Sequence, residues 1–283
     1  MIKLLSNGMR VLLLAASVLV FLAGFQLSVF TEHTDAYFAW TIQPPLTAAF
    51  LGAGYFASFL LEFLASREKE WASPRVAVPA VFTFTTLTLV ATLLNFDRFH
   101  FSSLDILPRA TAWFWLAIYT IVPPAMLGIW VKQSYIKGED PPRSAPLPKW
   151  LRTTLVGQAV VMLAVGVALF VAPNPAALFW PWKLTTLTSQ ATGAWLIGIG
   201  VFALQSALEN DFGRIKAGSA SFLGFGVLEL VALLRYPNNV DWMKASVWFY
   251  LVLMISIMLV GLYACLVLIR VGRKVSRRTP SSV

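Results

Sequence analysis

Eight stretches of the chain are apolar over a length that can cross a membrane. The hydrocarbon core of a bilayer needs about 17 to 25 such residues in a helix. The stretches lie near 11–31, 46–66, 76–95, 110–131, 153–173, 191–209, 218–235 and 245–269. Because a backbone inside lipid must satisfy its own hydrogen bonds, each stretch is predicted to be an α-helix. The pattern predicts an all-α integral membrane protein with eight transmembrane helices.

The first stretch has a rival interpretation as a secretory signal peptide. Lys3 and Arg10 precede an apolar run that contains Ala23 and Gly24, as in a leader with a small-residue cleavage site. We favour a retained helix because the apolar run continues past Gly24 to Phe30. A similar segment also recurs in the middle of the chain, where it cannot be a leader.

Composition supports a membrane location and excludes several other classes of protein. Hydrophobic residues make up 58% of the chain and charged residues 12%, whereas soluble domains hold about 25% charged residues. We therefore predict no nucleic-acid partner, despite the net charge of +9. A single cysteine excludes a disulfide scaffold or a CxxC centre within one chain. Phosphate-binding loops, dinucleotide-binding motifs and nucleophile elbows are also missing from the sequence.

Basic residues of the predicted loops are strongly biased to one side. All but five of the 22 Lys and Arg residues fall on the side that holds both termini. The five exceptions are Arg98, Arg109, Lys183, Arg235 and Lys244. Because cytoplasmic loops accumulate Lys and Arg, we predict cytoplasmic N and C termini in the plasma membrane. The basic C-terminal segment VGRKVSRR agrees with this orientation.

Residues of the first half recur in the second half. At an offset of 142, six residues align with identical ones: Arg10, Leu13, Val18, Gly24, Leu27 and Trp40 with Arg152, Leu155, Val160, Gly166, Leu169 and Trp182. After a loop adjustment, Gly52 and Gly54 align with Gly198 and Gly200. We predict two tandem four-helix repeats, 1–135 and 151–283, joined by a cytoplasmic linker, 136–150. An even number of helices makes the repeats parallel.

Glu229 is the first candidate site residue, because an ionised carboxylate inside a membrane is costly and usually functional. It lies within the seventh stretch, and its repeat counterpart is Thr88 in the third. The candidate ligand or proton site consists of Glu229, Thr85, Thr88, Thr92, Asn95 and Gln158. The four residues of the third stretch share one helical face, which predicts a polar seam between the third and seventh helices. Alternatively, these side chains only join helices by hydrogen bonds.

A second polar cluster lies at the outer ends of the first and third stretches. It consists of His33, Asp35, Asp97, Arg98 and His100. Histidine and carboxylate groups are zinc ligands, but neither segment has the HExxH or paired-His spacing of a metal site. We predict no metal and no cofactor, and we interpret the cluster as solvated loop residues.

Other polar and aromatic residues are assigned to the membrane borders. Glu62 and Glu209 lie near inner helix ends, and Arg67 and Arg214 follow each by five residues, beyond the reach of a helical ion pair. We predict that these residues anchor the helices at the interface. The tryptophans near span ends are expected to form interfacial belts: Trp40, Trp71, Trp130, Trp150, Trp180, Trp182 and Trp242.

The sequence does not identify a specific activity. We favour a non-enzymatic membrane protein that, besides the lipid bilayer, binds a hydrophobic small molecule, a lipid or a partner membrane subunit. The alternative is a small secondary transporter that is proton-coupled through Glu229. A weaker alternative is an outward-facing membrane enzyme that uses His33, Asp35, Asp97 and His100.

Overall fold

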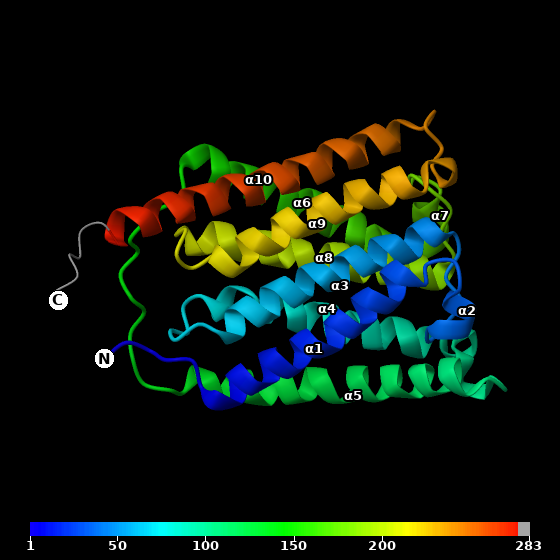
Figure 1. Ribbon diagram of the computed structural model, residues 1–283, viewed down its shortest axis with the longest axis horizontal. Coiled ribbons are helices and arrows are strands. Elements are labelled where there is room, and N and C mark those ends of the chain that lie inside the picture. The colour runs from blue at the N-terminus through cyan, green and yellow to red at the C-terminus, as the bar shows by residue number, and fades with distance from the viewer. Residues whose placement is uncertain (277–283) are drawn as a thin grey trace.

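The computed structural model describes residues 1–276, with side chains through residue 271, and consists of α-helices (Figure 1). Eight are long and apolar enough to cross a membrane: α1 (Asn7–Val29), α3 (Pro45–Ser66), α4 (Val78–Leu94), α5 (Ile106–Ser134), α6 (Lys149–Val171), α8 (Thr186–Glu209), α9 (Lys216–Arg235) and α10 (Ala245–Ser276). These helices coincide with the eight apolar stretches, so the prediction of a multi-pass helical membrane protein is confirmed. Arg277 and Arg278 of the predicted basic tail lie outside the described residues.

Shorter elements connect the long helices. They are the helices α2 (Thr34–Tyr37) and α7 (Pro173–Ala177) and the 3₁₀ turns η1 (Pro74–Val76), η2 (Phe96–Arg98), η3 (His100–Ser102) and η4 (Pro237–Asn239). Local signals set several helix ends. The Ser6 hydroxyl caps α1 by accepting from the Met9 N–H, and Thr185 and Thr188 form a capping box at the start of α8.

The long helices form two layers of four. One layer runs α1, α3, α9, α10, and the other runs α5, α4, α8, α6. The innermost helices α3, α4, α8 and α9 are buried along more than half of their length, whereas the flanking helices are mostly exposed. Figure 1 shows that α1 begins and α10 ends at the same end of the bundle, which we call the near end. The opposite end of the bundle is called the far end. Because α3 packs on α9 and α4 on α8, neither half of the chain packs as a separate unit.

Glycines in α3 and α8 allow close helix contacts. A Cβ atom on Gly193 of α8 would lie 2.6 Å from the carbonyl oxygen of Gly166 in α6. A Cβ atom on Gly52 of α3 would lie 2.6 Å from the Ser28 hydroxyl of α1. The helix pairs α6–α8 and α1–α3 therefore depend on glycine at these positions.

Hydrogen bonds and ion pairs join the loops at the near end. The Trp71 N–H donates to the Lys3 carbonyl at 3.0 Å, and the Phe212 N–H donates to the Ala145 carbonyl at 2.8 Å. Lys216 pairs with Glu68 at 2.8 Å. Segments far apart in the sequence are thus fixed against one another at this end.

The predicted anchoring role of Glu209 is wrong. Helix α8 ends at Glu209, and Asn210 adopts a left-handed conformation with φ 50°, so the chain reverses and brings Arg214 to 2.7 Å from the Glu209 carboxylate. The i+5 spacing argument fails because the helix has already ended. Arg75 forms a bidentate contact with the same carboxylate at 2.9 Å. Glu62 does not reach the interface either, since it is only 2% exposed.

The belt assignment is also wrong for four of the seven tryptophans. Trp40, Trp71, Trp180 and Trp182 are buried in the protein. The Trp40 ring packs on Trp115, with centroids 4.8 Å apart, and the Trp182 indole N–H donates to the Thr47 hydroxyl at 2.9 Å. Three of these tryptophans lie in the short segments after α2 and α7, which fold back over the far end of the bundle, whereas Trp71 lies in the near-end loop after α3, where its backbone N–H donates to the Lys3 carbonyl.

Candidate functional site

Glu229 lies at the interface of α9 and α10 and is fully buried, with 0% of its surface exposed. The Tyr250 hydroxyl donates to Glu229 Oε2 at 2.8 Å. The other carboxyl oxygen, Oε1, is buried without a hydrogen-bond partner. Within the described residues, Glu229 forms no ion pair. The carboxyl group therefore joins two helices and is shielded from the solvent around the protein.

The other members of the predicted polar seam are divided among different helix pairs. The Thr92 hydroxyl accepts from the Trp115 indole N–H of α5 at 3.0 Å. Asn95 donates to Gln190 of α8 at 2.6 Å. The Thr85 hydroxyl donates to carbonyls of its own helix, and the buried Thr88 hydroxyl has no partner. No seam with Glu229 forms, because α4 packs on α5 and α8 while α9 packs on α3 and α10.

Gln158 connects α6 to α10. Its side-chain amide donates to the Ser256 hydroxyl at 2.8 Å. Closer to the near end of the bundle, the Trp150 ring packs on Tyr263, with ring centroids 4.9 Å apart. These two contacts join helices that otherwise lie apart.

The outer cluster of histidines and carboxylates is not assembled into a site. His100 contacts the Phe38 carbonyl at 3.0 Å and the Thr41 hydroxyl at 3.1 Å. Asp97 pairs with Arg98 on the exposed surface, and His33 and Asp35 lie exposed at α2. In the described part of the chain, no three His, Cys, Asp or Glu side chains converge as metal ligands would. Within residues 1–276, no hydrogen bond of the kind that couples a catalytic acid to a base joins His33, Asp35, Asp97 and His100 to one another.

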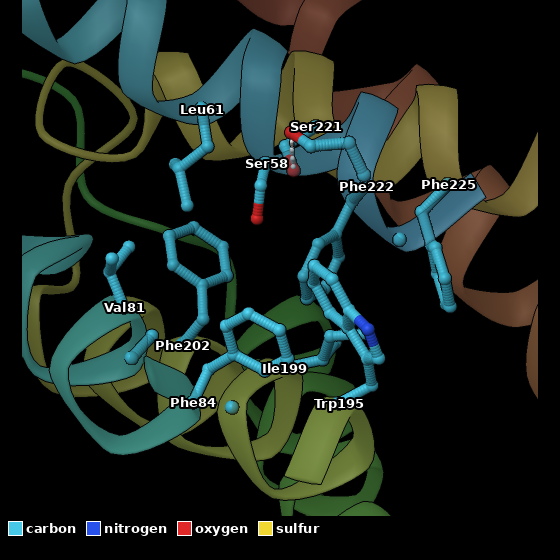
Figure 2. A pocket seen from close by; sticks show the side chains of 14 residues that line it. Ser58, Leu61, Val81, Phe84, Trp195, Ile199, Phe202, Ser221, Phe222 and Phe225 are labelled. Atoms are coloured by element: carbon cyan, nitrogen blue, oxygen red, sulfur yellow. Dashed lines mark hydrogen bonds between the residues drawn. The ribbon is translucent and has the colours of Figure 1, made fainter. Parts of the chain in front are cut away.

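A small cavity lies at the centre of the bundle, between α3, α4, α8 and α9 (Figure 2). Its volume is about 40 Å³, and its lining is aromatic and aliphatic except for Ser58 and Ser221. Figure 2 shows the Ser58 hydroxyl pointing into this space, while Ser221 donates to the Ala57 carbonyl at 2.8 Å. A cavity of this size holds no more than a few water molecules. Glu229 is not part of its lining.

A larger cavity, about 430 Å³, lies between α6 and α10 toward the far end. Side chains of α6, α8, α10 and the segment after α7 line it, including Met162, Val165, Leu169, Phe179, Trp180, Leu196, Phe249, Tyr250, Leu253 and Met254. Phe179 and Phe249 are 78% and 54% exposed, so the cavity borders the lipid-facing surface. Its volume lies in the range of small-molecule sites, which are mostly apolar. Tyr250, one of the lining residues, donates its hydroxyl to the Glu229 carboxyl group.

Comparison with known proteins gave no match: neither a family model, nor a curated protein, nor a solved structure is similar to this chain. A functional interpretation must therefore come from the geometry. The cavity between α6 and α10 was not predicted from the sequence, because hydrophobic patterns do not reveal the distance between two helices. The only signal in the sequence was the aromatic segment 178–182, of which Phe179, Trp180 and Pro181 form part of the cavity wall.

Removing the hydroxyl of Tyr250 tests the role of the Glu229 contact. In Tyr250→Phe, Oε2 of Glu229 loses its only hydrogen bond and both carboxyl oxygens are then buried without a partner, so we expect the free energy of unfolding to fall by about 1 to 3 kcal/mol. Thermal unfolding of the purified protein in detergent measures the effect. Tyr263→Phe is the control, because Tyr263 is 36% exposed, whereas Tyr250 is buried. Equal melting temperatures for the two variants would contradict a structural role of the Tyr250 hydroxyl.

Proposed function

We propose that this protein is a non-enzymatic plasma-membrane protein that binds a hydrophobic molecule between α6 and α10. The supporting observation is the cavity of about 430 Å³, whose lining is almost entirely apolar. The cavity borders the lipid-facing surface, because the lining residues Phe179 and Phe249 are exposed. An apolar space of this size is filled by a ligand or by lipid in a membrane.

The opening toward lipid supports entry of the ligand from within the membrane. The Gln158–Ser256 hydrogen bond and the Trp150–Tyr263 contact join helices α6 and α10, and both lie between the cavity and the near end. The exposed ring of Phe249 lies at the border of the cavity and the lipid-facing surface. A hydrophobic molecule in the bilayer can therefore reach the site without crossing water.

Filling the cavity is the direct test of the proposed function. Val165 and Val160 are both in α6, but Val165 lines the cavity and Val160 faces outward. We expect Val165→Trp to reduce the amount of co-purifying hydrophobic molecule at least tenfold, because the indole occupies its space. Val160→Trp should leave this amount unchanged. Solvent extraction of the purified proteins followed by mass spectrometry measures it, and equal amounts in both variants would contradict ligand binding in this cavity.

A transporter that uses Glu229 has less support. Such a mechanism requires a water-accessible path to the carboxyl group. Glu229 is fully buried against Tyr250 and lines neither the central cavity nor the α6–α10 cavity. The outward-facing enzyme also has less support, since its four proposed residues, His33, Asp35, Asp97 and His100, do not form a common site.

We also propose that the bundle consists of two tandem parallel repeats. Matching contacts support this architecture. In the ion pair Glu68–Lys216 the acid belongs to the first half of the chain and the base to the second, and in Glu209–Arg75 the assignment is reversed. The two acids are 141 residues apart, and so are the two bases. Such reciprocity is typical of a two-fold axis, here along the membrane normal.

Glycine contacts support the same register. Gly24 contacts Phe56 in the first half, and Gly166 contacts Ile197 in the second. Together with the matching ion pairs, these contacts favour an offset of 141 for the second and sixth helices. The alignment of Gly52 with Gly198 implies a larger offset and does not agree with them. The bond between Phe212 and Ala145, which matches that between Trp71 and Lys3, favours a second repeat that begins before residue 151.

The proposed orientation, with the near end in the cytoplasm, rests on the Lys and Arg bias of the loops. In a Cys265→Ser background, single cysteines at Lys183→Cys and Lys137→Cys report the two sides. We expect a membrane-impermeant maleimide to label position 183 in intact cells and position 137 only after permeabilisation. The reverse labelling pattern would overturn this orientation.

A further inference from the structure

We propose that the cavity between α6 and α10 holds an acyl chain of an anionic glycerophospholipid from the leaflet at the far end, with the lipid phosphate between Lys183 and Lys244. This inference rests on the proposed function and names its ligand. It combines the apolar cavity with a polar pocket that adjoins it at the far end of the bundle.

The polar pocket has a volume of about 520 Å³ and is formed by three connecting segments. They contribute Gln43 and Pro44, Pro181 to Lys183, and Asn238 to Asp241, together with Lys244 at the start of α10. Pro181 lines both the polar pocket and the apolar cavity, and Lys244 directly precedes Ala245 of the cavity. The two spaces are therefore adjacent, one polar and one apolar, as the two parts of a lipid are.

The charge of the polar pocket favours an anion. Lys183 and Lys244 supply two ammonium groups, whereas Asp241 is the only carboxylate in the lining. Among the side chains that the structure describes, neither lysine has a salt-bridge partner. Gln43, Asn238 and Asn239 add amide groups that can donate to phosphate or glycerol oxygens. A lipid phosphate would complete the charge balance of this pocket.

The depth of the apolar cavity fits one leaflet. Its lining on α10 extends from Ala245 to Met254, which is about 14 Å at a rise of 1.5 Å per residue. This is about half of the hydrocarbon thickness of a bilayer. The Gln158–Ser256 hydrogen bond lies on the near-end side of this lining and separates the cavity from a second apolar groove, which continues between the same two helices toward the near end. The cavity therefore accepts a chain that starts at the far interface and ends near the midplane.

A groove between α1 and α5 provides an internal comparison. It is also open toward the far end, and its lining on α1, α2 and α5 includes Phe25, Gln26, Tyr37, Thr111 and Phe114. No charged side chain is part of this lining. Lipid at this groove should therefore show no preference for an anionic headgroup, which separates specific headgroup binding from general contact with the membrane.

The test measures lipid retention by the full-length protein. Purified protein is exchanged into mixed micelles with equimolar phosphatidylglycerol and phosphatidylcholine of identical chains, and bound lipid is counted by native mass spectrometry. Each lysine near an anionic lipid contributes about fivefold in affinity, so we expect the wild type to prefer phosphatidylglycerol by about 25-fold. Lys183→Gln or Lys244→Gln should reduce this preference about fivefold, and the double variant should abolish it. Arg109→Gln, an exposed arginine outside the pocket, should leave it unchanged.

The outcomes separate this inference from the proposed function. Equal retention of both lipids by the wild type, or an unchanged preference in the double variant, would overturn the headgroup site. Loss of both lipids in Val165→Trp would then still support a hydrophobic ligand in the cavity. If Val165→Trp retains both lipids like the wild type, the cavity itself holds no lipid and both proposals fail. Melting temperatures of all variants show that each is folded.

Discussion

Glu209→Ala is expected to lower the free energy of unfolding by about 3 kcal/mol, because it leaves the buried Arg214 guanidinium with only a longer ion pair, to Asp140 at 3.7 Å. Arg214, with 9% of its side chain exposed, lies 2.7 Å from the Glu209 carboxylate. Arg75 binds the same carboxylate through two nitrogens. Removal of one acidic group thus affects the loop before α4, the end of α8 and the start of α9. Chemical or thermal unfolding in detergent measures the loss.

The matched control for Glu209→Ala is Arg98→Ala. Arg98 and Asp97 form an ion pair at the far end, but their side chains are 73% and 76% exposed. Solvent screens such pairs, so we expect less than about 1 kcal/mol for this variant. If both substitutions lower stability equally, burial does not determine the strength of the Glu209 cluster, and our interpretation of the near end is incorrect.

The second large effect is expected for Gly193→Ala. The new Cβ atom would lie 2.6 Å from the Gly166 carbonyl oxygen and 2.9 Å from the Phe170 backbone nitrogen. Neither is the mobile end of a side chain, so α6 and α8 must separate. Overpacking of this kind costs about 1 to 3 kcal/mol. We expect a corresponding decrease in melting temperature.

Gly157→Ala in α6 is the control for this prediction. No atom lies within 4 Å of a Cβ at Gly157, and alanine favours a helix over glycine by about 1 kcal/mol. We therefore expect unchanged or slightly higher stability. Should Gly193→Ala melt at the same temperature as Gly157→Ala, the tight α6–α8 contact does not exist in the membrane protein.

The Gly193 prediction also concerns the proposed lipid site. Helix α6 forms one wall of the cavity, and the Gly166–Gly193 contact holds this helix close to α8. Because α6 packs tightly on α8 and only loosely on α10, it cannot move toward α10 without losing that contact. The cavity is thus a consequence of where the small residues lie. Lipid binding in Gly193→Ala should weaken along with stability.

Much of the fold follows from local sequence properties. Helix α1, for example, follows from an apolar run long enough for the bilayer, and the capping hydroxyl of Ser6 sets its start. Length and hydropathy are properties of each segment alone, so all eight helices were predictable without knowledge of their neighbours. Composition likewise indicated a membrane protein, since only 12% of the residues are charged.

The candidate site required the tertiary structure. Glu229 was recognisable as unusual because any carboxyl group inside an apolar run is costly, but its partner Tyr250 is on another helix. Glu209 was misassigned because spacing along a helix says nothing about Arg75, which is 134 residues away. Lipid-facing and helix-facing apolar surfaces have similar compositions, so hydrophobicity does not specify which helices pair.

The sequence by itself thus determined the eight helices and the uneven distribution of basic residues, since segment length and charge are local. The tertiary structure alone decided which helices touch and where they separate. Packing of small residues such as Gly193 brings α6 to α8, and α10 packs on α9 with the Tyr250–Glu229 hydrogen bond between them. The space left between α6 and α10 is the cavity, and it depends on contacts between residues that are distant in the chain.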